Sequence, residues 1–146
     1  MTVVVGVDGL PRSYAAIRLA RQEAACRGAD LTAVMAYTGD TALGTPAARP
    51  LATPVPADEQ REMAESTLRQ AVRQALGSDQ GVTLRALPGM PGRVLVQVAQ
   101  TVDADLMVLA ARREHTPSRL LGPVSQHVLR NAPCPVLVVP EPGKEP

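Results

Sequence analysis

The stretch "VVVGVDGLPRSYAAIRLA", residues 3–20, joins an unbroken apolar run to a segment whose apolar residues have helical spacing. Consecutive valines are typical of a strand that is covered on both faces of a parallel sheet. After the turn, Ser13 is a suitable N-cap, so we expect a helix from there to Arg27 that ends at Gly28. A strand, a turn and a helix in this order begin an α/β fold with helices on both faces of the sheet.

The same alternation continues to residue 140, and 146 residues suit one compact domain. Five strands alternating with four helices predict a single open, five-stranded parallel α/β sheet with helices on both faces. The remaining strands are expected at 30–37, 81–87, 104–111 and 134–140, and the remaining helices at 58–76, 91–103 and 125–131.

Two segments fall outside this alternation. Residues 38–57 contain Pro46, Pro50, Pro54 and Pro56, which indicates a loop. A lid, a partner-binding segment and a plain linker are all compatible with this composition. The tail "EPGKEP", residues 141–146, is expected to be disordered.

Composition argues against several classes of protein. The net charge of +1 gives little electrostatic attraction for nucleic acid, and Tyr14 and Tyr37 are the only aromatic residues available to stack on bases. No apolar run approaches the roughly eighteen residues of a membrane span, and the N-terminus lacks a basic region followed by an apolar one. We therefore expect a cytoplasmic protein that binds neither nucleic acid nor membrane.

The two cysteines, Cys26 and Cys134, are isolated in the sequence. They show neither a C-x-x-C pair nor Cys/His ligand spacing, so we expect no disulfide framework and no metal site. Both are expected to be buried as small hydrophobic residues.

An open parallel sheet binds ligands beyond the carboxyl ends of its strands, where the strand order reverses. This rule points to two turns in the chain. The first is Val7 and Asp8 with the following glycine, and the second runs from Ala110 to Arg113 and continues at Gly122–Ser125.

Three segments resemble the universal stress protein family: "VVVGVDGLPRSYAAIRLA", "DLMVLAAR" and, most specifically, "GPVSQHVLRNAPCPVLVVP". The resemblance covers nearly the whole chain, with residues 1–140 as the domain. It implies a fold like that of the adenine-nucleotide alpha-hydrolases, with strand order 3-2-1-4-5, usually as a dimer. It also implies a role in stress tolerance or dormancy, in a family with one ATP-binding branch and one that does not bind ATP.

The motif that holds phosphate in the ATP-binding branch is degenerate here. It resembles G-x-x-G, nine residues, then G-S or G-T, but Ala110 and Arg113 take the two glycine positions. The spacer is one residue short, and Pro123 replaces the hydroxyl residue and removes an N–H donor. By resemblance, the nucleoside side is intact. The candidate nucleotide-binding residues are Val7, Asp8, Val34, Ala110, Arg112, Arg113, Gly122, Val124 and Ser125.

The arginines after the fourth strand have three interpretations, which the sequence leaves open. They point into solvent, or Arg112 and Arg113 replace the lost backbone donors for phosphate, or Arg113 pairs with Asp8 and fills the adenosine site. Asp8 itself could contact a ribose hydroxyl or satisfy N–H groups in its own turn. His115 and His127 are expected to occupy surface or helix positions, so no catalytic residue is expected.

The final strand, Val136–Val139, would be an edge strand in the implied order. An apolar edge invites pairing with a second copy, which predicts a homodimer through this strand. The chain is then expected to be a non-enzymatic stress-response module that meets an unknown protein partner, with ATP binding weak or lost. The alternative is a sensor that binds ATP with Mg²⁺ through Arg112 and Arg113. Slow ATP hydrolysis is conceivable from the resemblance, but a hydrolase or ligase needs a glycine-rich loop after the first strand, which "GVDGLPRS" lacks.

Overall fold

The computed structural model describes residues 1–38, 55–111 and 122–140. Most of the proline-rich segment, the run that includes Arg112, Arg113 and His115, and the predicted disordered tail lie outside these residues. The described elements are β1 (Thr2–Gly6), α1 (Arg12–Arg27), β2 (Asp30–Tyr37), α2 (Ala57–Leu76), β3 (Val82–Pro88), α3 (Pro91–Thr101), β4 (Leu106–Ala110), α4 (Pro123–Asn131) and β5 (Val136–Val139).

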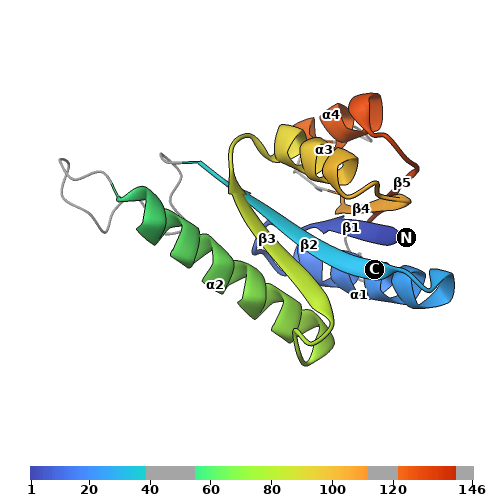
Figure 1. The fold of residues 1–146 in the computed structure, drawn as a ribbon, viewed down its shortest axis with the longest axis horizontal. Helices are drawn as coiled ribbons and strands as arrows, with labels where there is room; N and C mark the ends of the chain where they lie inside the picture. The colour runs from blue at the N-terminus through green and yellow to red at the C-terminus, as the bar shows by residue number, and fades with distance from the viewer. Residues whose placement is uncertain (39–54, 112–121, 141–146) are drawn as a thin grey trace, which may run out of the picture.

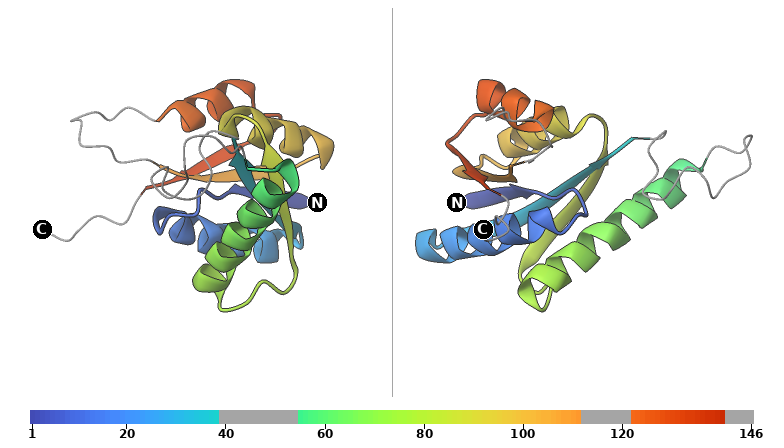
Figure 2. Two further views of the ribbon diagram at one scale, coloured as in Figure 1. Left: turned by 90° about the vertical axis from the view of Figure 1, so that its left-hand side faces the viewer. Right: turned by 180° about the vertical axis from the view of Figure 1, so that it is seen from behind.

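The strands form one sheet in the order β3-β2-β1-β4-β5, and every neighbouring pair is parallel. The predicted architecture and strand order are therefore confirmed. The sheet lies between two helical layers, with α1 and α2 on one face and α3 and α4 on the other (Figures 1 and 2). Strand order reverses at β1, whose neighbours are β2 and β4.

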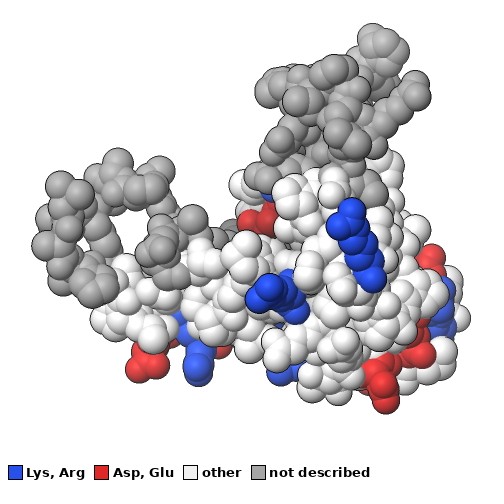
Figure 3. Space-filling view, turned by 90° about the horizontal axis from the view of Figure 1, so that it is seen from above, with Lys and Arg blue, Asp and Glu red and all other residues white. Residues whose placement is uncertain are grey.

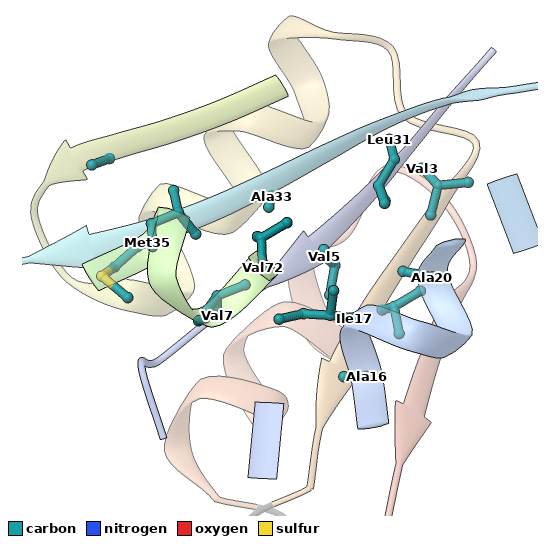
Figure 4. Packing of buried hydrophobic residues seen from close by; sticks show 14 of the residues in the cluster. Val3, Val5, Val7, Ala16, Ile17, Ala20, Leu31, Ala33, Met35 and Val72 are labelled. Carbon is teal, nitrogen blue, oxygen red and sulfur yellow. The ribbon is translucent and has the colours of Figure 1, made fainter. Parts of the chain in front are cut away.

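Strand β1 supplies side chains to both halves of the core. Val3, Val5 and the following Val7 pack with α1 and α2, whereas Val4 packs with α3 and α4. Val5 and Ile17 of α1 are both fully buried and lie side by side (Figure 4). Burying each such side chain contributes roughly 1.5–3 kcal/mol, which explains why a run of valines at this position determines the fold.

Three helix starts differ from the predictions. Helix α2 begins at Ala57, one residue before the predicted Asp58. Helix α1 begins at Arg12 after Pro11, without a side-chain cap, so the prediction that Ser13 caps it is wrong. The Ser13 hydroxyl instead bonds to Asp8. Helix α4 begins at Pro123 rather than at Ser125, because proline at the first helical position loses no intrahelical hydrogen bond.

The predicted ends of the two longer helices are confirmed. Gly28 and Gly77 close α1 and α2 with φ of 62° and 84°, in the left-handed region that favours glycine. Among the described helices, none is long and apolar enough to cross a membrane.

The prediction for the cysteines is only half right. Cys134 is partly buried against the core under α3 and α4, but Cys26 is exposed. Cys26 follows the buried Ala24 by two residues, and two residues on a helix turn the side chain through about 200°, away from the core.

Candidate functional site

A cavity of about 290 Å³ lies at the carboxyl ends of β1 and β4. The ends of β1, β2 and β4 and the starts of α1, α3 and α4 line it. The sheet order places the cavity where strand order reverses, as expected for an open parallel sheet. The lining includes seven of the nine predicted residues: Val7, Asp8, Val34, Ala110, Gly122, Val124 and Ser125. Arg112 and Arg113 lie outside the described residues.

The apolar wall of the cavity depends on Gly6. A Cβ at this position would lie 3.0 Å from both Leu95 Cδ1 and Leu109 Cδ2. The missing side chain lets these two leucines approach β1, and both line the cavity. A side chain at residue 6 would push the two leucines apart or fill the space between them. The shape of the cavity therefore depends on glycine at this position.

Asp8 closes the turn between β1 and α1. Its Oδ1 accepts a hydrogen bond from the Leu10 N–H at 2.9 Å and another from the Ser13 hydroxyl. The Asp8 N–H donates to Ser13 Oγ at 3.2 Å, so the two residues bond reciprocally. The proposed role of Asp8 in satisfying N–H groups of its turn is therefore present in the structure, and Asp8 also lines the cavity.

Gly9 makes this turn possible. Its φ is +79°, and a Cβ built there would lie 2.9 Å from Thr67 Cγ2 of α2. Any other residue would meet both backbone strain and a steric clash. The glycine thus holds the turn, and with it Asp8, close against α2.

Arg12 lines the same cavity, and we did not predict it from the sequence. Its Nε donates to Asp8 Oδ2, and the Arg12 side chain is only 20% exposed. The signal was present in the sequence, because Arg12 follows Asp8 by four residues. The four-residue spacing indicates a side-chain pair only within a helix, and Asp8 precedes α1.

The opposite wall is the first turn of α4. Gly122 occupies the N-cap, and its carbonyl accepts the first helical hydrogen bond, from the Gln126 N–H at 3.0 Å. The N–H groups of Val124 and Ser125 therefore have no acceptor within the helix, while Pro123 has no N–H to offer. Within residues 123–125 of α4, a bound anion would meet two backbone donors rather than three.

The charges cancel within the described lining of the cavity. Within its described lining, Asp8 and Arg12 are the only charged residues, one of each sign. On the face seen in Figure 3, positive and negative side chains of the described residues are scattered among neutral ones.

His127 has a packing role in α4. A Cβ on Gly92 of α3 would lie 3.0 Å from the Cβ, Cγ and Cδ2 atoms of His127. The imidazole thus occupies space that the glycine leaves between the two helices. No group of three or more His, Cys, Asp or Glu side chains among the described residues is placed to hold a metal ion.

The chain matches the model of the universal stress protein family over residues 1–140. It belongs to the universal stress protein family. A universal stress protein of Mycobacterium tuberculosis is 32% identical over 139 residues, covering 94% of this chain and 47% of that protein. One of Thermus aquaticus is 31% identical over 152 residues, covering 94% of this chain and 97% of that protein. This universal stress protein thus spans about half the length of the mycobacterial relative.

A solved structure with the same fold carries a ligand. It is the crystal structure of a universal stress protein in complex with cAMP, which matches with a TM-score of 0.71 and 31% identity. The match covers 97% of this chain and 98% of that one. The sequence resemblance to the family is therefore confirmed by sequence and by structure.

Proposed function

We propose that this universal stress protein is a non-enzymatic stress-response module that binds an adenosine nucleotide of low charge, such as AMP or cAMP, and binds ATP weakly. Residues 1–140 are the proposed domain, and the working form is a homodimer that meets another protein. The observation that carries the proposal is the cavity that brings Val7, Asp8 and Val34 together with Gly122, Val124 and Ser125.

The size of the cavity favours a small nucleotide. Small-molecule sites usually measure roughly 300–1,000 Å³, so a cavity of about 290 Å³ is at the lower limit of that range. Such a volume suits a nucleoside with one phosphate better than a nucleoside with three. The apolar wall of Leu95 and Leu109 suits a planar base.

The charge balance points the same way. A triphosphate needs several donors, whereas the described lining offers one guanidinium, paired with Asp8, and the two backbone donors of α4. Pro123 removes a third donor. A single phosphate needs fewer donors, and a relative of this chain at 31% identity was crystallised with cAMP, which carries one phosphate.

The β5 edge of the sheet supports the homodimer. Strand β5 pairs with β4 on one side and is last in the strand order. The carbonyl groups of Pro135 and Val139 accept from the Met107 and Ala111 N–H groups of β4. Because these groups alternate along a strand, Val136 and Val138 direct their backbone N–H and C=O groups to the outer edge. An antiparallel copy of β5 would satisfy them.

Isothermal titration of the whole chain with AMP, with cAMP and with ATP plus Mg²⁺ tests the ligand. We expect saturable binding of AMP or cAMP and weaker binding of ATP. If ATP binds more tightly than about 100 μM, roughly −5.5 kcal/mol, and more tightly than AMP, the chain is the nucleotide sensor instead, using Arg112 and Arg113. If no adenosine nucleotide binds, the proposed ligand is wrong.

A further inference from the structure

We propose that Arg12 is the residue that recognises the phosphate of the bound nucleotide. This inference rests on the proposed function and assigns a specific role to a residue of the same cavity. Arg12 is the first residue of α1 and lines the cavity together with Gly122, Val124 and Ser125 at the start of α4. The residue that carries the guanidinium group and the two residues of α4 that carry free backbone N–H groups thus line the same cavity.

The Asp8 carboxylate prepares Arg12 for this role. It accepts from the Arg12 Nε, which fixes a long side chain that would otherwise lose rotamer freedom when a ligand binds. A guanidinium has five N–H donors, and this bond uses one of them. The donors on the two Nη atoms are left to form the paired hydrogen bonds that phosphate oxygens accept.

The negative charge of Asp8 is itself compensated. Besides Arg12, its carboxylate accepts from the Leu10 N–H and the Ser13 hydroxyl. These three donors reduce the repulsion that a carboxylate would exert on a phosphate nearby. The Arg12 side chain is 20% exposed and that of its partner Asp8 is 38% exposed, so water screens the Arg12 guanidinium less than that of a fully exposed arginine.

A second role for Arg12 is purely structural, namely to hold Asp8 in place. The two roles differ in what they predict for ligands that have or lack a phosphate. If Arg12 only positions Asp8, the loss of Arg12 lowers the affinities for adenosine and AMP equally. If Arg12 binds the phosphate, the loss of Arg12 lowers the affinities for AMP and cAMP but leaves the affinity for adenosine nearly unchanged.

The experiment compares adenosine, AMP and cAMP by calorimetric titration of the whole chain and its variants. Arg12→Gln is expected to weaken AMP and cAMP by about 10- to 150-fold, the usual effect of losing a hydrogen bond to a charged group, and adenosine by less than about threefold. Arg12→Lys keeps the positive charge and is expected to recover part of the AMP affinity.

Arg27→Gln is the matched control. Arg27 lies on the same helix and also pairs with an acidic residue four positions away, Glu23, with Nε 3.3 Å from Oε2. It does not line the cavity, so all three affinities should stay within about twofold of those of the unaltered chain. Thermal unfolding of each variant shows whether it is folded.

The outcomes separate this inference from the proposed function. Equal weakening of adenosine and AMP in Arg12→Gln, or no weakening of either, overturns the role of Arg12 while the nucleotide site stands. Failure of the unaltered chain to bind AMP and cAMP overturns the proposed function, and this inference with it. If the Arg12→Gln chain does not fold, Arg12→Lys is used in its place. The inference then requires that Arg12→Lys lowers the AMP affinity at least threefold more than the adenosine affinity, and a smaller difference overturns it.

Discussion

Val7 donates its backbone N–H to the carbonyl oxygen of Val34 at 2.9 Å. This bond extends the pairing of β1 and β2 one residue beyond Gly6, which is opposite Val34 in the register. Asp8 is therefore the first residue to leave the sheet, directly beside the cavity. The position of the carboxylate is set by the strand before it and by the turn after it.

Replacing Asp8 with alanine is expected to destabilise the domain. The substitution removes a carboxylate that accepts from Leu10, Arg12 and Ser13 and leaves these donors without it. We expect the free energy of unfolding to fall by about 1–3 kcal/mol, measured by urea denaturation. Glu23→Ala, which breaks an exposed ion pair on α1, should change the free energy of unfolding by about 0.5 kcal/mol or less. Equal effects of both substitutions would contradict the structural role of Asp8.

The turn around Asp8 also shows what could be predicted from the sequence. Strand β1 was evident because an apolar run is a local signal, and Gly28 and Gly77 were evident because helix ends favour glycine. The N-cap prediction for Ser13 is wrong because the Ser13 hydroxyl has two possible partners, the helix backbone and Asp8. The structure shows that it bonds to Asp8.

The sequence predicted only part of the candidate site, because some of its residues are placed by the strand order and others by side-chain contacts. The sheet order brings the ends of β1 and β4 together, so residues such as Val7 and Ala110 could be placed from the topology alone. Arg12 could not, because its orientation depends on a side-chain bond to Asp8. Leu95 likewise reaches the cavity only because Gly6 leaves room for it.

Gly92→Ala tests the packing of α3 on α4. Alanine usually stabilises a helix by up to about 1 kcal/mol relative to glycine, so a gain would be expected on propensity alone. Here the added Cβ would lie 3.0 Å from three atoms of His127, including its Cβ. We expect a net loss of about 1–2 kcal/mol in the free energy of unfolding, because α4 must shift.

His127→Ala provides the control for Gly92→Ala. It removes the Cγ and Cδ2 contacts but keeps the Cβ contact. In a double-mutant cycle followed by urea denaturation, the cost of Gly92→Ala should be smaller in the His127→Ala background. An unchanged cost would show that the imidazole does not limit the approach of the two helices.

Pro123→Ser tests whether the start of α4 limits phosphate binding. The serine restores a backbone N–H and adds a hydroxyl beside the cavity. We expect the affinity for ATP to rise about fivefold, equivalent to roughly 1 kcal/mol for one added hydrogen bond, as measured by calorimetry. Pro91→Ser is the matched control, because Pro91 also opens a helix and lines the cavity. A similar rise in ATP affinity in both variants would show that the start of α4 does not specifically limit phosphate binding.

The two cysteines should react differently with iodoacetamide. Burial, with a further contribution from the Asp105 carboxylate, raises the pKa of Cys134, whereas Cys26 is exposed. Only the thiolate reacts, so near pH 8 we expect Cys26 to be alkylated several-fold faster, as followed by peptide mass spectrometry. The rate at Cys134 should rise as the pH approaches its raised pKa.

Asp105→Asn and denaturation are the controls for this difference. The asparagine keeps an oxygen that can accept from the Thr2 N–H, which bonds to Asp105 Oδ2 at 2.8 Å, but removes the negative charge. It should therefore lower the pKa of Cys134 and narrow the difference in rate. Alkylation in concentrated urea should proceed at similar rates at both sites. A difference that persists in urea would show that folding is not its cause.

Val138→Pro tests the proposed dimer at the edge of the sheet. The N–H of Val138 is directed away from β4, because the carbonyl groups that accept from β4 belong to Pro135 and Val139, and by alternation to Leu137. Proline at residue 138 therefore removes a donor from the outer edge and leaves the bonds to β4 intact. We expect the mass measured by light scattering at micromolar concentration to fall from that of two chains to that of one. Val138→Thr keeps the N–H and a β-branched side chain, so it should remain dimeric. If the Val138→Pro chain is still dimeric, the interface does not lie at β5. If the unaltered chain is monomeric, the proposed homodimer is wrong.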